Sequence, residues 1–330
     1  MPGEEMKRGW IALAVVLVAG WAAAADTGAV RRVWVWSDAH IGLNNDTSRD
    51  RDGAEWLQAA AQDVRGRVGP VAWVLSLGDI ANASQRAEYE QYAAIRTRSG
   101  LGPWFEIPGN HDYAGVKTGL WKNCVGSPRR FILADGNGVW ICFGVERGGA
   151  GGKIAESTLA WLRGAIASNQ THNVIVCSHQ ALGHTVARSG ASKNCLYCPM
   201  DGDPEPEGEG ENKEEGSIPA IKRVEKVVAD LRVDLWLCGH IHGTSYGAGN
   251  SVRRGRTTFI NIASITPSYG RHESGSFVLE FREGARAVTA RRRNHSTGTT
   301  DKAFDTVVEF PYPWHFTGPP KIEGRPVVEE

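Results

Sequence analysis

The sequence predicts an α/β protein built on a largely parallel β-sheet. Short runs of apolar, β-branched and aromatic residues alternate along the chain with segments whose apolar residues recur at helical spacing. Side chains that are able to bind a metal ion follow several of these runs directly. Strands that alternate with helices form parallel sheets, which bind ligands at the carboxyl ends of their strands. The sequence therefore predicts a site at that edge of the sheet.

The N-terminal part of the chain contains three such strand units. Buried strands are predicted at 31–37, 71–77 and 103–107, with helices at 52–67 and 87–98 between them. Each strand leads into polar residues: Asp38 and His40 after the first, Asp79 after the second, and Asn110, His111 and Asp112 after the third.

The rest of the chain continues the pattern. A hairpin is predicted around Asp135 to Gly138, and helices at 156–167 and 217–231. A strand at 173–178 ends at His179, whose place at the strand edge favours it over His184 as a ligand. The remaining predictions are a strand at 233–238 that leads to His240 and His242, and three further strands at 257–263, 276–282 and 285–293.

The domain organisation follows from these elements and from local composition. One domain is predicted over residues 26–293. Within it, residues 185–217 contain two cysteines and an acidic tract rich in Gly and Pro, which predicts a surface insertion. Residues 294–330 are predicted to form a C-terminal extension that wraps the surface.

The N-terminus has the features of a secretory signal peptide over residues 1–25. Lys7 and Arg8 precede an uncharged run from Gly9 that ends in consecutive alanines at Ala25. The predicted mature protein is exported to a periplasmic or extracellular space and keeps no membrane span. The alternative is an uncleaved N-terminal membrane anchor, because the run is close to the shortest length that spans a bilayer.

Export changes the interpretation of the six cysteines, since disulfides persist in oxidising compartments. Cys142, Cys177 and Cys238 lie in apolar strands and are predicted to be buried thiols. Loop-like sequence surrounds the others, and a structural disulfide among Cys124, Cys195 and Cys198 is the favoured interpretation.

The candidate ligands exceed the three or four that one ion needs. Their number points to two ions that share a carboxylate, and imidazole, carboxylate and amide groups suit Fe, Mn or Zn. Two such ions can clamp a phosphate and activate a bridging water for in-line attack. The ligand candidates are Asp38, His40, Asp79, Asn110, His179, His240 and His242, and the catalytic candidates are His111 and Asp112.

The candidate residues fall into five short motifs, which are, in chain order, Asp38-x-His40, Gly78-Asp79, Gly109-Asn110-His111-Asp112, His179 and Gly239-His240-x-His242. In order and type, these motifs resemble those of calcineurin-like metallophosphoesterases. The resemblance covers about residues 33–293. It implies two packed β-sheets flanked by helices. It also implies one metal on Asp38, His40, Asp79 and His242, and another on Asp79, Asn110, His179 and His240.

The predicted function is metal-dependent hydrolysis of phosphomonoesters or small phosphodiesters by a bridging hydroxide. His111 is expected to protonate the leaving oxygen or stabilise charge, with Asp112 orienting its ring. Purple acid phosphatases place a Tyr three residues after the bridging Asp. This chain has Asn82 there, which argues against the iron site of that branch.

The expected partner is a small phosphorylated substrate, and the oligomeric state stays open. Basic and acidic residues balance at 37 each, which argues against nucleic acid as a substrate. The alternatives are a nuclease or cyclic-nucleotide phosphodiesterase of the same family, a non-catalytic metal- or phosphate-binding protein on the same scaffold, and a thiol-redox protein centred on Cys195 and Cys198.

Overall fold

The computed structural model describes residues 28–43, 51–148, 151–186, 195–199, 218–242, 251–267 and 273–323. The predicted signal peptide and the acidic tract of the predicted insertion lie outside these residues. Within the described ranges, no helix is both long enough and apolar enough to cross a membrane.

The first sheet is mixed, with a parallel half and an antiparallel half. Strands β1, β2 and β3 run parallel, and the other three follow β1 antiparallel to one another. Its spatial order is β14 (Thr299–Glu309), β13 (Ala287–Asn294), β12 (Gly275–Arg282), β1 (Val30–Trp36), β2 (Trp73–Ser76) and β3 (Trp104–Glu106).

The second sheet is also mixed, with four parallel strands at its centre. These are β11, β9, β7 and β5, and antiparallel strands flank them on both sides. Its spatial order is β10 (Ser251–Arg254), β11 (Thr257–Asn261), β9 (Leu235–Cys238), β7 (Asn173–Ser178), β5 (Gly138–Phe143), β4 (Arg130–Asp135) and β15 (Lys321–Glu323). A small separate pair joins β6 (Gly152–Lys153) to β8 (Leu196–Tyr197).

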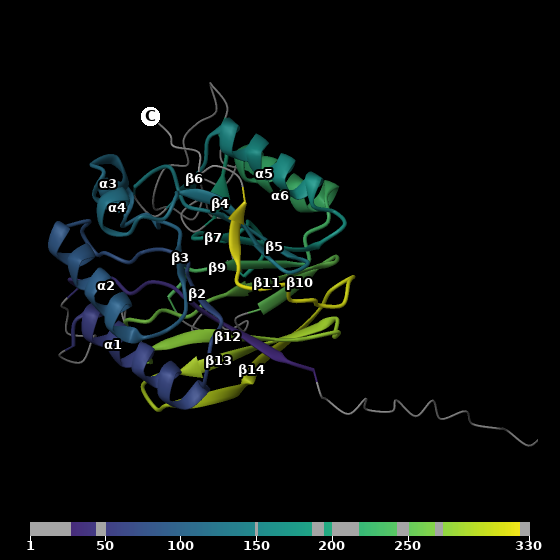
Figure 1. The fold of residues 1–330 in the computed structure, drawn as a ribbon. Helices are drawn as coiled ribbons and strands as arrows, with labels where there is room; N and C mark the ends of the chain where they lie inside the picture. The colour runs from purple at the N-terminus through teal and green to yellow at the C-terminus, as the bar shows by residue number, and fades with distance from the viewer. Residues whose placement is uncertain are drawn as a thin grey trace, which may run out of the picture.

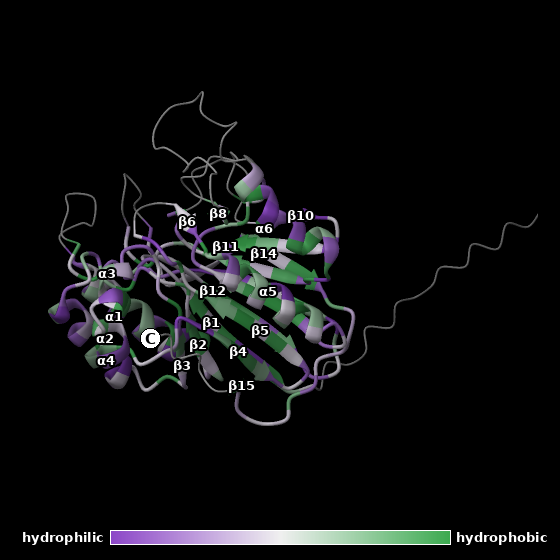
Figure 2. Ribbon diagram, turned by 90° about the horizontal axis from the view of Figure 1, so that it is seen from above, coloured by the Kyte–Doolittle hydropathy of each residue, from purple (hydrophilic) through white to green (hydrophobic). Residues whose placement is uncertain are grey.

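The sheets pack face to face and helices cover their outer faces, which confirms the predicted architecture (Figure 1). Apolar side chains of both sheets share one buried cluster. Helices α1 (Gly53–Asp63) and α2 (Arg86–Ser99) pack on the first sheet, and α5 (Glu156–Ser168) and α6 (Ile218–Asp230) on the second. Figure 2 shows the hydrophobic strands at the centre. Shorter elements are α3 (Tyr113–Lys117), α4 (Leu120–Cys124) and the π-helical turn η1 (Val64–Val68) after α1.

The C-terminal segment differs from its prediction. Residues 299–309 form β14, which pairs with β13 and extends the first sheet instead of wrapping the surface. Beyond it, Phe310 and Trp314 are 3% and 1% exposed and belong to the cluster between the sheets. The ring of Trp314 lies 4.6 Å from that of Phe281 on β12. This segment therefore contributes to the core.

The predicted structural disulfide is wrong, because none of the six cysteines forms one. Cys195 and Cys198 flank β8 with buried side chains, and the backbone of Cys195 forms a bridge with Ala181. Burial raises the pKa of both thiols to about 12, which keeps them protonated and weakens the thiol-redox alternative. Cys142, Cys177 and Cys238 are buried as predicted.

We expect Trp314→Ala to destabilise the protein by about 3–5 kcal/mol, because it removes a large side chain from a closed core. Chemical denaturation, monitored by circular dichroism, measures the change. The matched control is Val307→Ala on β14, where the side chain is 61% exposed and the expected change is within about 0.5 kcal/mol. Equal effects of the two substitutions would contradict the core position of the C-terminal segment.

Candidate metal centre

The carboxyl ends of β1, β2, β7 and β9 bring six of the predicted ligands into two groups, all of them buried except the half-buried His240. The first cluster consists of Asp38, His40, Asp79 and His242, and the second of Asp79, His179 and His240. Within each cluster the potential ligand atoms all lie within 4.8 Å of one another. Asp79 belongs to both.

Asp79 uses its two carboxylate oxygens differently. Oδ2 lies 3.1 Å from Nε2 of His179 in the second cluster and 3.7 Å from Nε2 of His40 in the first. Oδ1 accepts a hydrogen bond from the backbone N–H of His111 at 2.8 Å. The loop after β3 therefore holds the carboxylate so that one oxygen faces both clusters.

The backbone that presents these ligands is strained. Asp38, His40, Asp79 and His240 have φ angles of 57°, 44°, 53° and 67°, in the left-handed region that residues with a side chain rarely adopt. Each such residue costs about 1–3 kcal/mol and persists only where its surroundings hold it. Strain concentrated at four potential ligands is typical of a functional site.

Close packing between loops holds this backbone in place. The N–H of Asp38 donates to the carbonyl of Gly78, and that of His40 to the carbonyl of Asp79, which ties the loops after β1 and β2 together. A Cβ atom at Gly78 would lie 2.5 Å from the backbone nitrogen of Gly109. One at Gly109 would lie 2.2 Å from Oδ1 of Asp79. Only glycine allows this approach.

The first cluster has the chemistry of a metal site. Nε2 of His242 lies 3.0 Å from Nε2 of His40 and 3.1 Å from Oδ1 of Asp38. Asp38 and His40 are 0% and 2% exposed. Two imidazole nitrogens and two carboxylates that converge in a buried space form a donor set that suits zinc, iron or manganese. These residues fit a metal ion.

The second cluster is oriented by a backbone carbonyl and contacts Asn110. Nδ1 of His179 donates to the carbonyl of Leu77 at 2.7 Å, which directs Nε2 toward the cluster. This Nε2 lies 3.1 Å from Oδ1 of Asn110 and 3.1 Å from Asp79. The structure thus brings the seventh predicted ligand beside the second cluster.

Burial and charge set the protonation of these groups. Burial, assisted by His179, lowers the pKa of His240 to about 4, and burial also lowers the pKa of His40. Both rings are neutral at pH 7, as a metal ligand must be. Burial opposes ionisation of Asp79, but the neighbouring imidazoles hold its pKa below the usual range. Burial also opposes protonation of His179, yet Asp79 raises its pKa to about 9.

The expectation that Asp112 orients His111 is wrong. Nδ1 of the His111 ring meets the carbonyl of Asn82 at 2.7 Å. Asp112 is fully buried and faces the other way. Its carboxylate accepts hydrogen bonds at 3.0–3.2 Å from the backbone of Gly109, Ile80 and Ala81 and from the hydroxyl of Tyr89. Asp112 therefore ties the loops after β2 and β3 together, and no hydrogen bond between its carboxylate and the ring of His111 is found among the described residues.

With His240, His111 is one of two half-buried histidines among the described residues of the site. The ring of His111 packs edge-on against that of His40 with 4.6 Å between centroids. Because Asn82 occupies Nδ1, Nε2 is the ring nitrogen that can address a substrate.

Gln180 is a site residue that the sequence analysis did not select. It directly follows His179, is fully buried, and its Nε2 donates to Oδ1 of Asn110 at 3.1 Å. The sequence signal that could have identified Gln180 is its position as a polar residue beside a predicted ligand at a strand end. His184, in contrast, is exposed and contacts Glu225 at 2.6 Å outside the site.

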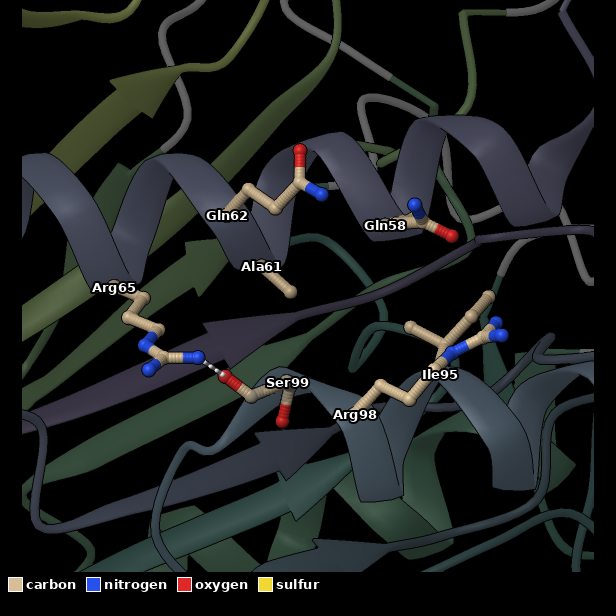
Figure 3. Close-up of a pocket in the computed structure, with 7 residues that line it drawn as sticks. All are labelled: Gln58, Ala61, Gln62, Arg65, Ile95, Arg98 and Ser99. Carbon is tan, nitrogen blue, oxygen red and sulfur yellow. Dashed lines mark hydrogen bonds between the residues drawn. The ribbon is translucent and has the colours of Figure 1, made fainter.

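A cavity elsewhere in the molecule contains none of these groups. It lies between α1 and α2, where Arg65 donates to the carbonyl of Ser99 (Figure 3). Its lining residues are Gln58, Ala61, Gln62, Arg65, Ile95, Arg98 and Ser99. It is separate from the metal clusters.

We expect metal binding at the second cluster to displace a proton from His179. Since the pKa of this ring is about 9, apparent affinity should rise about tenfold per pH unit between pH 6 and 8.5. Calorimetric titration in buffers of different ionisation enthalpy measures both effects. The exposed His184→Gln is the matched control and should keep this dependence. Affinity that is constant with pH, without proton release, would contradict the assignment.

Comparisons with known proteins agree with this geometry. The family model of calcineurin-like phosphoesterases matches residues 31–244. A purple acid phosphatase from yellow lupin (Lupinus luteus) seeds is similar in structure, with 14% identity and a TM-score of 0.56 over 86% of this chain and 54% of that one. This chain therefore spans about half the length of the lupin enzyme, and the likeness shows the fold alone.

Two Vps29 structures are also similar. That of Entamoeba histolytica, a single mutant, has 15% identity and a TM-score of 0.40, and covers 84% of this chain and 99% of its own. That of Chaetomium thermophilum has 12% identity and a TM-score of 0.37, and covers 86% and 99%. No curated protein matches the chain in sequence. The family model spans more than half of the chain, and the chain belongs to the calcineurin-like phosphoesterase family.

Proposed function

We propose that the protein is an exported phosphoesterase that uses two metal ions to hydrolyse phosphomonoesters or small phosphodiesters. The observation that supports this most directly is the buried carboxylate of Asp79, whose Oδ2 faces both ligand clusters. A structural ion needs one closed set of ligands, whereas two adjacent sets on a shared carboxylate are typical of hydrolytic sites.

The residues divide between two ions, with Fe, Mn or Zn as the candidates. Asp38, His40, Asp79 and His242 would hold the first, and Asp79, Asn110, His179 and His240 the second. When bound, such a pair binds phosphate oxygens, lowers the pKa of water and stabilises charge in an in-line displacement. The predominance of imidazole and carboxylate ligands suits these metals better than calcium.

Besides the metal ligands, His111 is the side chain of the protein that we propose to act at the leaving group. With Nδ1 fixed on the carbonyl of Asn82, Nε2 can donate a proton to the leaving oxygen or a hydrogen bond to the phosphate. The ring of His40, against which His111 packs, is buried, whereas His111 is half-buried and therefore more accessible to a substrate. No Ser or Cys nucleophile is required.

The charge of the chain supports a small substrate. The balance of 37 basic and 37 acidic residues provides no field that attracts a long polyanion. We therefore propose a small phosphorylated molecule as the substrate rather than nucleic acid. Ions held at the two sites would supply the positive charge that binds a phosphate group.

A metal-dependent activity screen tests the proposal. After removal of metal by chelation and reloading with Mn, Fe or Zn, we expect hydrolysis of p-nitrophenyl phosphate, of its bis-ester, or of both. His111→Ala should keep both ions by elemental analysis while kcat falls by about 10²–10⁴-fold. Asp79→Asn should lose metal and activity together.

The screen also separates the alternatives. Cyclic nucleotides are included, and turnover confined to them would indicate a cyclic-nucleotide phosphodiesterase. Absence of turnover of every ester with all three metals, in protein that retains two ions, would contradict the enzymatic proposal and favour a binding protein.

Export is supported by Lys7, Arg8 and the uncharged run that ends at Ala25. Expression of the full chain in a secreting host should give a soluble protein whose N-terminus, determined by mass spectrometry, begins after the alanine run at residues 22–25. Recovery of the intact chain in the membrane fraction would instead indicate an uncleaved anchor.

A further inference from the structure

Gln180 contacts Asn110, a proposed ligand of the second ion, without belonging to the predicted ligand set. Its side chain is fully buried, and Nε2 donates to Oδ1 of Asn110 at 3.1 Å. The same Oδ1 lies 3.1 Å from Nε2 of His179. Two neighbours thus meet the one atom by which Asn110 can bind a metal.

The orientation of the Asn110 amide decides whether this side chain can bind a metal. An asparagine amide presents either an oxygen, which binds metals, or an NH₂ group, which does not. The χ2 torsion of asparagine has a broad and roughly two-fold distribution, so both orientations of the amide are accessible. His179 does not decide between them in the loaded site, because its Nδ1 donates to Leu77 and its Nε2 would bind the ion. A donor directed at Oδ1, such as the N–H of Gln180, favours the orientation that presents the oxygen.

Gln180 is itself held firmly. Its backbone carbonyl accepts from Oγ of Ser178 at 2.7 Å, and that hydroxyl accepts from Nε1 of Trp236 at 2.8 Å. Its Cβ and Cγ lie against Gly152, where an added Cβ would be 2.9 and 3.1 Å from them. The side chain of Gln180 therefore has little room to move, and its amide group is held against Asn110.

The other end of the amide supports a role for this glutamine beyond stability. Oε1 of Gln180 is buried and has no hydrogen-bond partner within the described part of the chain. A buried acceptor without a partner destabilises a fold, and an apolar side chain of similar length would avoid that cost. The donor end therefore has a role that offsets the cost of the acceptor end.

We propose that Gln180 is a positioning residue for the second metal ion, because its N–H selects the oxygen face of Asn110. The inference rests on the proposed function, which supplies that ion. The first cluster shares Asp79 but has no contact with Gln180 among the hydrogen bonds of the described residues. The affinity of the first cluster for a metal ion is therefore an internal reference.

The test begins with Gln180→Met, which keeps the length of the side chain and removes both polar atoms. By calorimetry with Mn or Zn, we expect the second ion to bind about 10–100-fold more weakly and the first to be unchanged. Gln180→Leu provides a second variant if the first does not fold. The matched control is Gln170→Met, since the side chain of Gln170 bonds to the backbone of Ile166 and Arg232 and should leave both affinities unchanged.

A double-mutant cycle with Asn110→Asp separates positioning from a general structural effect. A carboxylate presents oxygen in either orientation, so in the Asn110→Asp background Gln180→Met should change the second affinity less than twofold. Equal losses in both backgrounds, or no loss in the native background, would overturn the inference. If the native protein binds two ions, these outcomes leave the proposed function standing. Binding of fewer than two ions would overturn both.

Discussion

The carboxylate of Asp79 is the contact on which the arrangement of the site depends. Its Oδ2 lies between the imidazoles of the two clusters, and its Oδ1 is fixed by the backbone N–H of His111. The left-handed backbone at Asp79 and the close approach of Gly78 to Gly109 leave this carboxylate little freedom. The strain is maintained by the packing around it, which preorganises the ligands before any ion binds.

The site also depends on how the two sheets pack. Strands β1 and β2 of the first sheet present Asp38, His40 and Asp79, whereas β7 and β9 of the second present His179, His240 and His242. Neither sheet alone completes a cluster. The apolar core between the sheets therefore fixes the distances across the site, and β14 with the segment that follows it adds to this core. Stability and metal geometry are coupled through the same interface.

Much of this arrangement could be predicted from sequence because each ligand follows an apolar run at a strand end. Because parallel strands run in the same direction, such residues meet at the carboxyl edge of the sheet, whatever the order of the strands. The role of Asp112 could not be predicted, since its partners are backbone N–H groups of loops distant in sequence. Strand β14 was missed because it lies at a sheet edge and most of its residues are exposed or half-exposed, which obscures the alternating pattern. The cysteine prediction failed because spacing in sequence does not report distance in space.

The most direct test of the account is anomalous diffraction from crystals of the metal-loaded protein. We expect two peaks about 3.5–4 Å apart, one on each side of Oδ2 of Asp79, with Asn110 and His179 beside the second. A single peak, or two peaks that do not share Asp79, would contradict the claim that this carboxylate bridges two ions.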